Sequence, residues 1–413
     1  MDFLAVTKQV TNIINDTAVA DIHTHLYSEA FGELMLWGVD ELLTYHYLAP
    51  ELLRLRPDLR PQDYFKLGKK EQAELVWQEI FVTHTPLSEA ARGVVTVLHE
   101  LGVDTSEKDL NTVRKYFQDF SPAEYIDKVF ELANIKSVVM TNDPFDKTER
   151  KVWNQSKHQD ERFKSALRLD GFLMNYTENL PALHEQGFSM SENLEEKTII
   201  ASRDFLKHWI DLITPEYMAV SLPPDFRPDD GSVCARLMRL CVLPVAQECH
   251  LPFAMMIGVK RQVNPELELA GDGVGKTDVS AIEELACEYP DVKFMITLLS
   301  RENQHELCVA ARKFRNILPF GCWWFLNNPS IIHEITSERI EMLGLTMIPQ
   351  HSDARVLDQL IYKWSHSRSV IAAVLAAKYF DIMKTGWRVT KEDIQRDVNR
   401  ILGGRILEEF RGG

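Results

Sequence analysis

Two histidines at the end of a short apolar run are the first residues in this sequence that could do chemistry. His23 and His25 follow residues 18–22 in the stretch AVADIHTHL. In a β-strand, side chains two residues apart point to the same face, so both imidazoles would converge on one point. With 13 histidines in 413 residues, about 0.4 such pairs arise by chance, so their position after an apolar strand matters more than their spacing.

A carboxylate far along the chain completes a ligand set. Asp353 lies in PQHSDAR, at the end of the last apolar run. Two imidazoles and one carboxylate suit a divalent metal ion, and imidazole favours Zn²⁺. A cation would keep Asp353 ionised, so that it could also serve as a base. In the structural alternative, the histidines hydrogen-bond to loops and Asp353 is the N-cap of a helix that starts at Val356.

Two arginines near this set predict an anionic substrate. Arg168 lies in the otherwise apolar stretch ALRLD, and Arg355 follows Asp353 by two residues. A guanidinium in a buried strand needs a partner, and a substrate carboxylate fits its planar pair of donors. A salt bridge between Arg168 and Asp170 is the alternative.

Aromatic residues and further histidines add weaker candidates. His46 and Tyr47 in TYHYL are predicted to contact a substrate, although core or surface positions are the usual places of such residues. The indoles of GCWWF suit a sugar ring, with apolar packing as the alternative. The other polar candidates after apolar runs are Asn142, Asp143, Asp170, Trp323, Trp324 and His351, whereas His305 is expected on a helix surface.

Eight apolar runs must position these residues. They are rich in β-branched residues, alternate with segments of helical periodicity, and read VADIHTH, IKSVVMTND, FKSALRLD, YMAVSLPP, LPFAMMIGV, VKFMITLLS, ILPFGCWWF and LTMIPQHSD. Strands that alternate with helices predict a parallel sheet, and eight strands close a (β/α)8 TIM barrel. A doubly wound sheet is the alternative, but no GxGxxG follows the first strand. In a barrel, the carboxyl ends of the strands face one active site.

Two further helical segments flank the predicted barrel. Residues 27–134 have helical periodicity and predict an insertion after the first strand that caps the barrel mouth. Residues 356–413 predict C-terminal helices packed on the barrel. The barrel core is therefore assigned to residues 1–26 and 135–355.

Composition limits the partners and the location. Forty-six basic against 61 acidic residues give a net charge of -15, which disfavours nucleic acids. We find no secretion signal and no apolar run long enough to span a membrane. The six cysteines form no CxxC pair, which is typical of reduced thiols in a cytoplasmic protein. We expect a cytoplasmic homo-oligomer that acts on a small molecule.

The motifs DIHTHL, LLTYHYL, ALRLD, GCWWF and SDAR, in this order, resemble the uronate (glucuronate) isomerase family of the amidohydrolase superfamily. The resemblance extends over almost the whole chain and implies a distorted barrel that interconverts D-glucuronate with D-fructuronate, and D-galacturonate with D-tagaturonate. It implies that His23, His25 and Asp353 bind a metal and that Arg168 and Arg355 bind the substrate. It also implies that His46 and Tyr47 contact the sugar and that Trp323 or Trp324 lines the pocket.

One position departs from the family pattern. Family members have a histidine on the fifth strand, in a stretch similar to QLHIG, whereas this chain has Met255 and Met256 in FAMMIG. A thioether cannot donate a hydrogen bond and is a poor ligand for a borderline cation. The chain therefore resembles a divergent branch, in which Lys260 or Arg261 could supply a positive charge that other members place differently.

The implied chemistry is proton transfer through an enediol. Asp353, or water held by it, would be the base, with Tyr47 or His46 acting on the hydroxyl oxygens and the arginines holding the carboxylate. One alternative is a metal-dependent hydrolase of a sugar-acid lactone or amide. Another is a uronate-binding homologue without catalysis.

Overall fold

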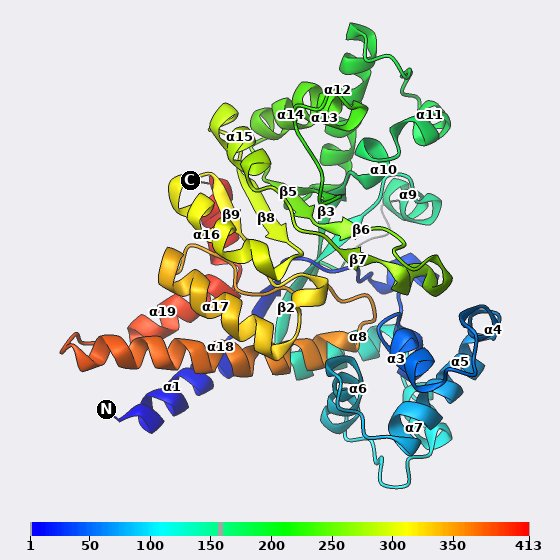
Figure 1. Ribbon diagram of the computed structural model, residues 1–413, viewed down its shortest axis with the longest axis vertical. Coiled ribbons are helices and arrows are strands. Elements are labelled where there is room, and N and C mark those ends of the chain that lie inside the picture. Colours follow the sequence, from blue (N-terminus) through cyan, green and yellow to red (C-terminus); the bar gives the residue numbers. More distant parts are fainter. Residues whose placement is uncertain (1, 156–159, 413) are drawn as a thin grey trace.

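A curved parallel sheet forms the centre of the molecule (Figure 1). The computed structural model describes residues 2–155 and 160–412. Within these residues, seven parallel strands are hydrogen-bonded in the order β1-β2-β3-β4-β5-β8-β9. Their bounds are β1 (Val19–Asp21), β2 (Ile135–Asn142), β3 (Phe163–Arg168), β4 (Met218–Leu222), β5 (Phe253–Ile257), β8 (Phe294–Leu298) and β9 (Ile317–Pro319).

Residues 345–353, the eighth predicted strand, lie between β9 and β1 but do not form a regular strand. Ile348 forms an isolated parallel bridge with Phe320, next to β9. On the other side, the Asp353 amide donates to the His23 carbonyl at 3.1 Å. The prediction of a distorted (β/α)8 barrel is confirmed.

Both faces of the barrel wall are apolar because helices cover the outside and side chains fill the inside. β5 shows the alternation: Ala254 and Met256 belong to the inner cluster, whereas Phe253 and Met255 pack outward against the helices. This dual burial explains why the strands appear in the sequence as continuous apolar runs.

The barrel end formed by the amino ends of the strands is closed by the last helix, α20 (Arg405–Gly412). Ile406 and Leu407 are 4% and 5% exposed and belong to the cluster inside the barrel, with Phe410 packed against it. Lys136 donates to the carbonyl of Gly403 at 2.8 Å and so ties this end of the chain to β2. The sequence pattern predicts C-terminal helices packed on the barrel. It does not predict that α20 fills one end of the barrel as a plug.

The remaining barrel helices surround the sheet (Figure 1). Their bounds are α9 (Lys147–Asn154), α10 (Asp170–Leu173), α11 (Tyr176–Glu185), α12 (Glu196–Ile213), α13 (Val233–Leu237), η3 (Met238–Val242), α14 (Leu243–Glu248), α15 (Ser280–Glu288), η5 (Arg301–Asn303), α16 (Gln304–Lys313), η6 (Trp324–Leu326) and α17 (Pro329–Leu343). The amino-terminal helix α1 (Phe3–Asp16) packs along α18 (Gln359–Lys384), and α19 (Lys391–Leu402) contacts both α1 and α20.

The segment between β1 and β2 is helical, and its first helices form a lobe beside the barrel (Figure 1). Its elements are η1 (Glu29–Leu34), α2 (Val39–Thr44), α3 (Leu48–Leu55), α4 (Pro61–Phe65), α5 (Lys69–Val76), η2 (Trp77–Thr83), α6 (Glu89–Glu100), α7 (Leu110–Gln118) and α8 (Pro122–Ala133). The helical pattern is interrupted between α2 and α3, within TYHYL, and Pro50 lies in the first turn of α3. We retain the division into core, insertion and C-terminal helices as a proposal.

The fifth predicted strand is split at Gly258. Gly258 has φ +126°, and a side chain there would meet Leu299 and the Gly275 carbonyl, so glycine is required where the chain turns. The chain continues as an antiparallel hairpin of β6 (Val259–Lys260) and β7 (Gly273–Val274), joined through η4 (Pro265–Gly271). Figure 1 shows this hairpin at the edge of the barrel, and η4 contacts α3 and α4 of the lobe.

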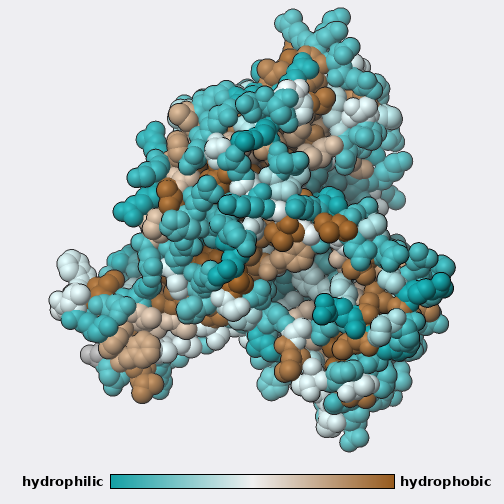
Figure 2. Space-filling view, viewed as in Figure 1, coloured by the Kyte–Doolittle hydropathy of each residue, from teal (hydrophilic) through white to brown (hydrophobic). Residues whose placement is uncertain are grey.

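On the face in Figure 2, apolar side chains form separate small groups among hydrophilic ones. Among the described residues, no helix has both the length and the apolar character needed to cross a bilayer.

Candidate active site

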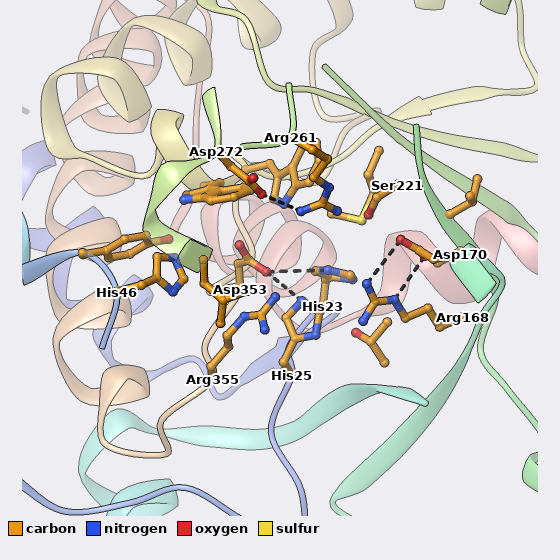
Figure 3. Close-up of a pocket in the computed structure, with 18 of the residues that line it drawn as sticks. His23, His25, His46, Arg168, Asp170, Ser221, Arg261, Asp272, Asp353 and Arg355 are labelled. Atoms are coloured by element: carbon orange, nitrogen blue, oxygen red, sulfur yellow. Dashed lines mark hydrogen bonds and ion pairs between the residues drawn. The ribbon is translucent and has the colours of Figure 1, made fainter. Parts of the chain in front are cut away.

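A pocket of about 270 Å³ opens at the carboxyl ends of the strands, the end where barrel enzymes place their chemistry. Every residue that the sequence analysis assigned to metal, substrate or catalysis lines it. Its polar and aromatic lining residues are His23, His25, Tyr45, His46, Tyr47, Thr141, Arg168, Asp170, Ser221, Arg261, Asp272, Trp323, Trp324, Asp353 and Arg355. Figure 3 shows ten of these residues labelled around the cavity.

His23, His25 and Asp353 converge at one side of this pocket (Figure 3). One potential ligand atom from each lies within 4.8 Å of the other two. The Asp353 Oδ1 atom is 3.7 Å from His23 Nε2 and 3.3 Å from His25 Nε2. His23 Nε2 and Asp353 Oδ1 are buried and lack a hydrogen-bond partner among the described residues. Buried polar atoms that face one another without bonding fit a divalent metal ion, because a cation would satisfy them.

The backbone around Asp353 explains this convergence. Asp353 has φ +51°, a left-handed conformation that aspartate adopts more readily than most residues. The flanking amide of Ser352 donates to Asp21 Oδ1 at 3.1 Å, and the His25 amide donates to the Ala354 carbonyl at 2.7 Å. The chain thus joins the end of β1 to the last segment from both sides. The N-cap alternative for Asp353 is wrong, because α18 begins at Gln359 with Asp358 as its N-cap.

The protonation states also suit a cation. Burial lowers the pKa of His23 to about 3 and that of His25 to about 4, so both rings are neutral near pH 7. Burial alone would raise the pKa of Asp353, but His25, His23 and Lys363 outweigh it and hold that pKa well below its usual range. Two neutral imidazoles and one carboxylate are the forms that bind a divalent ion.

The three arginines of the pocket differ in their partners. Arg168 forms a salt bridge with Asp170 at 3.1 Å, which also raises the pKa of Arg168, and Arg261 donates to Asp272 at 2.6 Å. Arg355 has no ion-pair partner within residues 2–155 and 160–412. Arg168 therefore forms the salt bridge expected in the alternative and also lines the pocket, while its binding of a substrate carboxylate stays a prediction. The Arg355 guanidinium lines the pocket and is free to pair with an anion.

His46 and Tyr47 reach the pocket because they lie in the break between α2 and α3. Burial lowers the pKa of His46 to about 4 and raises the pKa of Tyr47 well above its usual value. Both side chains are therefore neutral near pH 7. Lys363 lies 5.7 Å from the centre of the Tyr47 ring and donates to the Ser352 carbonyl at 2.6 Å.

The sequence did not show which of the two tryptophans lines the pocket. In the structure, both do. Trp323 is 4% exposed. Trp324 is partly exposed, adopts φ +45° and stacks on Phe325 with ring centres 4.7 Å apart. Its ring also meets the edge of His46 at 5.8 Å.

On the fifth strand, Met256 lines the pocket and Met255 does not. Met256 therefore occupies the inward position on the strand where the family pattern has histidine. The thioether of Met256 donates no hydrogen bond and is a poor ligand for a borderline cation.

Several predicted candidates lie outside the pocket. Asn142 donates to Glu149 Oε2 at 2.8 Å, and Asp143 Oδ1 accepts from the Phe145 amide at 2.9 Å, so both stabilise the loop before α9. Lys260 is exposed on the hairpin, and His305 is exposed on α16, as expected for His305. His351 is fully buried behind His23, with ring centres 5.1 Å apart, and does not reach the cavity.

Four residues at or near the pocket were not predicted from the sequence: Asp272, Tyr45, Ser221 and Tyr217. Tyr45 lies within TYHYL and could have been included with His46 and Tyr47. Asp272 reaches the pocket through the hairpin, and its Oδ1 atom also accepts from the Gln262 amide at 2.8 Å. The Tyr217 hydroxyl lies 3.0 Å from His23 Nδ1. No local pattern indicates either contact, because both depend on long-range packing.

Comparisons with solved structures include one match at 50% identity and two at 15% identity. The chain is 50% identical to an uronate isomerase from Bacillus halodurans, over 100% of this chain and 97% of that chain, with a TM-score of 0.97. It is 15% identical to an uronate isomerase from Thermotoga maritima (98% and 97% covered, TM-score 0.77) and to a glucuronate isomerase from Caulobacter crescentus (98% and 94%, TM-score 0.75). No protein-family model and no curated protein matches the chain.

Proposed function

The chain belongs to the uronate isomerase family, and on this premise we propose that it interconverts D-glucuronate with D-fructuronate, and D-galacturonate with D-tagaturonate. The observation that supports this most strongly is the 50% identity over the full chain to an uronate isomerase. The two distant structures support the fold alone. The pocket chemistry agrees with the proposal. Arg355 is a cation that can bind the substrate carboxylate, and His46 and Tyr47 are neutral groups that can exchange protons with the substrate hydroxyls.

Asp353 is the proposed base. In the open-chain aldose, it removes the proton from C2, next to the C1 aldehyde, while the C1 oxygen gains a proton. The resulting enediol then loses the proton of its C2 hydroxyl, and Asp353, whose carboxyl proton exchanges with solvent while the enediol exists, delivers a proton to C1, which gives the ketose. The net reaction adds and removes no atom or electron. The low pKa of Asp353 keeps this carboxylate ionised near pH 7, the form that a base requires.

His46 and Tyr47 are proposed to move the oxygen-bound protons. Neutral Tyr47 can donate to a substrate oxygen, and neutral His46 can donate with one ring nitrogen and accept with the other. Arg355 is proposed to hold the substrate carboxylate, with Arg168 beside it neutralising charge. Trp323 and Trp324 are proposed to form an apolar wall for the carbon chain.

We propose that His23, His25 and Asp353 hold one divalent ion and that this ion is Zn²⁺. The neutral imidazoles and the unbonded buried atoms support this assignment. When bound, such an ion supplies positive charge where the substrate oxygens become negative.

We also propose a cytoplasmic location and a homo-oligomer without nucleic-acid partners. All six cysteines are free, which fits a reducing compartment. Size-exclusion chromatography with light scattering would test the oligomer.

The test of the function is incubation of the purified protein with D-glucuronate or D-galacturonate, followed by an assay for the ketose. Ketose formation supports the isomerase. Acid release from a glucuronolactone, without ketose from the free acid, would instead support a hydrolase. Thermal stabilisation by uronates without any turnover would support a binding protein.

A further inference from the structure

We infer that Tyr217 is a positioning residue that fixes the tautomer and the orientation of the His23 ring. Tyr217 directly precedes β4 and is fully buried within the barrel interior. β4 and β1 are separated by two strands in the sheet, so the phenol reaches His23 across the interior. The inference uses the metal-ligand role proposed for His23 and does not depend on isomerase activity.

The hydrogen bonds of the Tyr217 hydroxyl determine where the proton lies. The oxygen is 2.7 Å from the Ile22 carbonyl oxygen and 3.0 Å from His23 Nδ1. A hydroxyl has one hydrogen, and a carbonyl can only accept, so the shorter contact uses that hydrogen. The contact with His23 is then a hydrogen bond only if Nδ1–H donates to the Tyr217 oxygen. A neutral ring with its proton on Nδ1 has a bare lone pair on Nε2.

That lone pair points to the place where the other ligand atoms gather. His23 Nε2 is buried, has no hydrogen-bond partner in the described chain and lies 3.7 Å from Asp353 Oδ1. In the opposite tautomer, Nε2–H would have to be buried without an acceptor at hydrogen-bond distance, which is unfavourable. Tyr217 therefore supplies the outer-shell hydrogen bond that ligating histidines usually make, here from a phenol.

Packing makes room for this contact and restrains the ring. Ala166, Ala219 and Ala254 line the same interior on β3, β4 and β5, and their small side chains leave space for the phenol. His351 and Phe320 lie against the His23 ring, with centres 5.1 Å and 6.4 Å away. The neighbours limit the tilt of the ring, and the Tyr217 hydroxyl fixes its in-plane direction.

The proton position can be read directly in metal-free protein. We expect ¹⁵N spectra of histidine-labelled protein at pH 7.5 to show His23, assigned by the loss of its signals in His23→Gln, with the proton on Nδ1. The Tyr217→Phe variant should show a mixture of tautomers or the proton on Nε2. A wild-type His23 with its proton on Nε2 would overturn the inference, whether or not the protein is an isomerase.

Zn²⁺ binding, measured by competition with a chromogenic chelator, gives a second readout. Tyr217→Phe should bind Zn²⁺ roughly 10- to 100-fold more weakly than the wild type, the usual cost of losing an outer-shell partner. Tyr176→Phe is the matched control, because Tyr176 is 2% exposed and donates to the Ser191 carbonyl at 3.0 Å outside the pocket. We expect the control to lose comparable stability but no Zn²⁺ affinity. Equal Zn²⁺ affinity of folded Tyr217→Phe and wild type would overturn the inference.

Discussion

The two ends of the barrel are formed by the same strands but have opposite chemistry. At the carboxyl ends, the pocket gathers charged groups, and buried atoms such as His46 Nε2 and Asp353 Oδ1 lack hydrogen-bond partners among the described residues. At the amino ends, α20 fills the opening with Ile406 and Leu407. Unbonded polar atoms cost stability, whereas buried apolar side chains supply it. The comparison indicates that turnover depends on one end and stability on the other.

The largest expected effect is on turnover at the pocket end. Asp353→Asn removes the proposed base but keeps the shape of the side chain. We expect kcat for glucuronate isomerisation to fall on the order of 10³-fold or more, while the far-UV circular dichroism spectrum stays unchanged. A variant with turnover within tenfold of the wild type would show that another group removes the proton.

At the opposite end, the expected effect is on stability. Leu407→Ala should lower the free energy of unfolding by about 2–5 kcal/mol, because it leaves a cavity in the plug. The kcat of the folded protein should stay within about twofold, as α20 lies away from the pocket. The exposed Glu408→Ala is the control and should change stability by less than about 0.5 kcal/mol. A loss of kcat in folded Leu407→Ala would contradict the separation of the two ends.

Substrate binding sharpens the comparison within the pocket end. Arg355→Met should raise KM roughly 10- to 100-fold for glucuronate and galacturonate alike, since both have the carboxylate that Arg355 is proposed to hold. Lys260→Met, on the exposed face of the hairpin, should leave KM unchanged. Unequal effects of Arg355→Met on the two uronates would indicate that Arg355 instead contacts a hydroxyl in which they differ.

The smallest expected effect concerns a buried acid at the pocket end that does not enter the pocket. Burial raises the pKa of Glu149 to about 7, and the side chain accepts hydrogen bonds from Tyr27 and Asn142. Between the usual pKa of glutamate and about 7, the folded state binds more protons than the unfolded state. The stabilisation that protonated Glu149 gives to the folded state is therefore present at low pH and is lost as the pH rises through 7.

Glu149→Gln removes this titration. We expect the stability of the wild type relative to Glu149→Gln to fall by about 1–3 kcal/mol between pH 5 and pH 8, as measured by urea unfolding. Turnover should not change, because Glu149 does not line the pocket. A difference in stability that is independent of pH would show that Glu149 is ionised throughout.

The sequence was sufficient to predict features that depend on local pattern. Apolar runs predicted the strands, and polar residues at their ends, such as His23, His25 and Asp353, predicted the pocket wall. The strands and the pocket are linked because the carboxyl ends of the strands in a closed parallel barrel meet at one edge of the sheet. Arg168 and Arg355 followed from the same rule.

Features that depend on long-range packing could not be predicted. Nothing near Tyr217 indicates that its hydroxyl bonds to His23, which lies 194 residues earlier. The Asp272 carboxylate enters the pocket only because Gly258 turns the chain into a hairpin. The amphipathic pattern of α20 predicts a buried face but not that this face closes the barrel.

The most direct test of proton transfer by Asp353 is isomerisation of D-glucuronate in D₂O, followed by NMR of the product. A proton taken from C2 by a carboxylate exchanges with solvent, so the D-fructuronate formed should have deuterium at C1. Absence of ketose, or ketose with only the original hydrogen at C1, would contradict proton transfer through an enediol at this site.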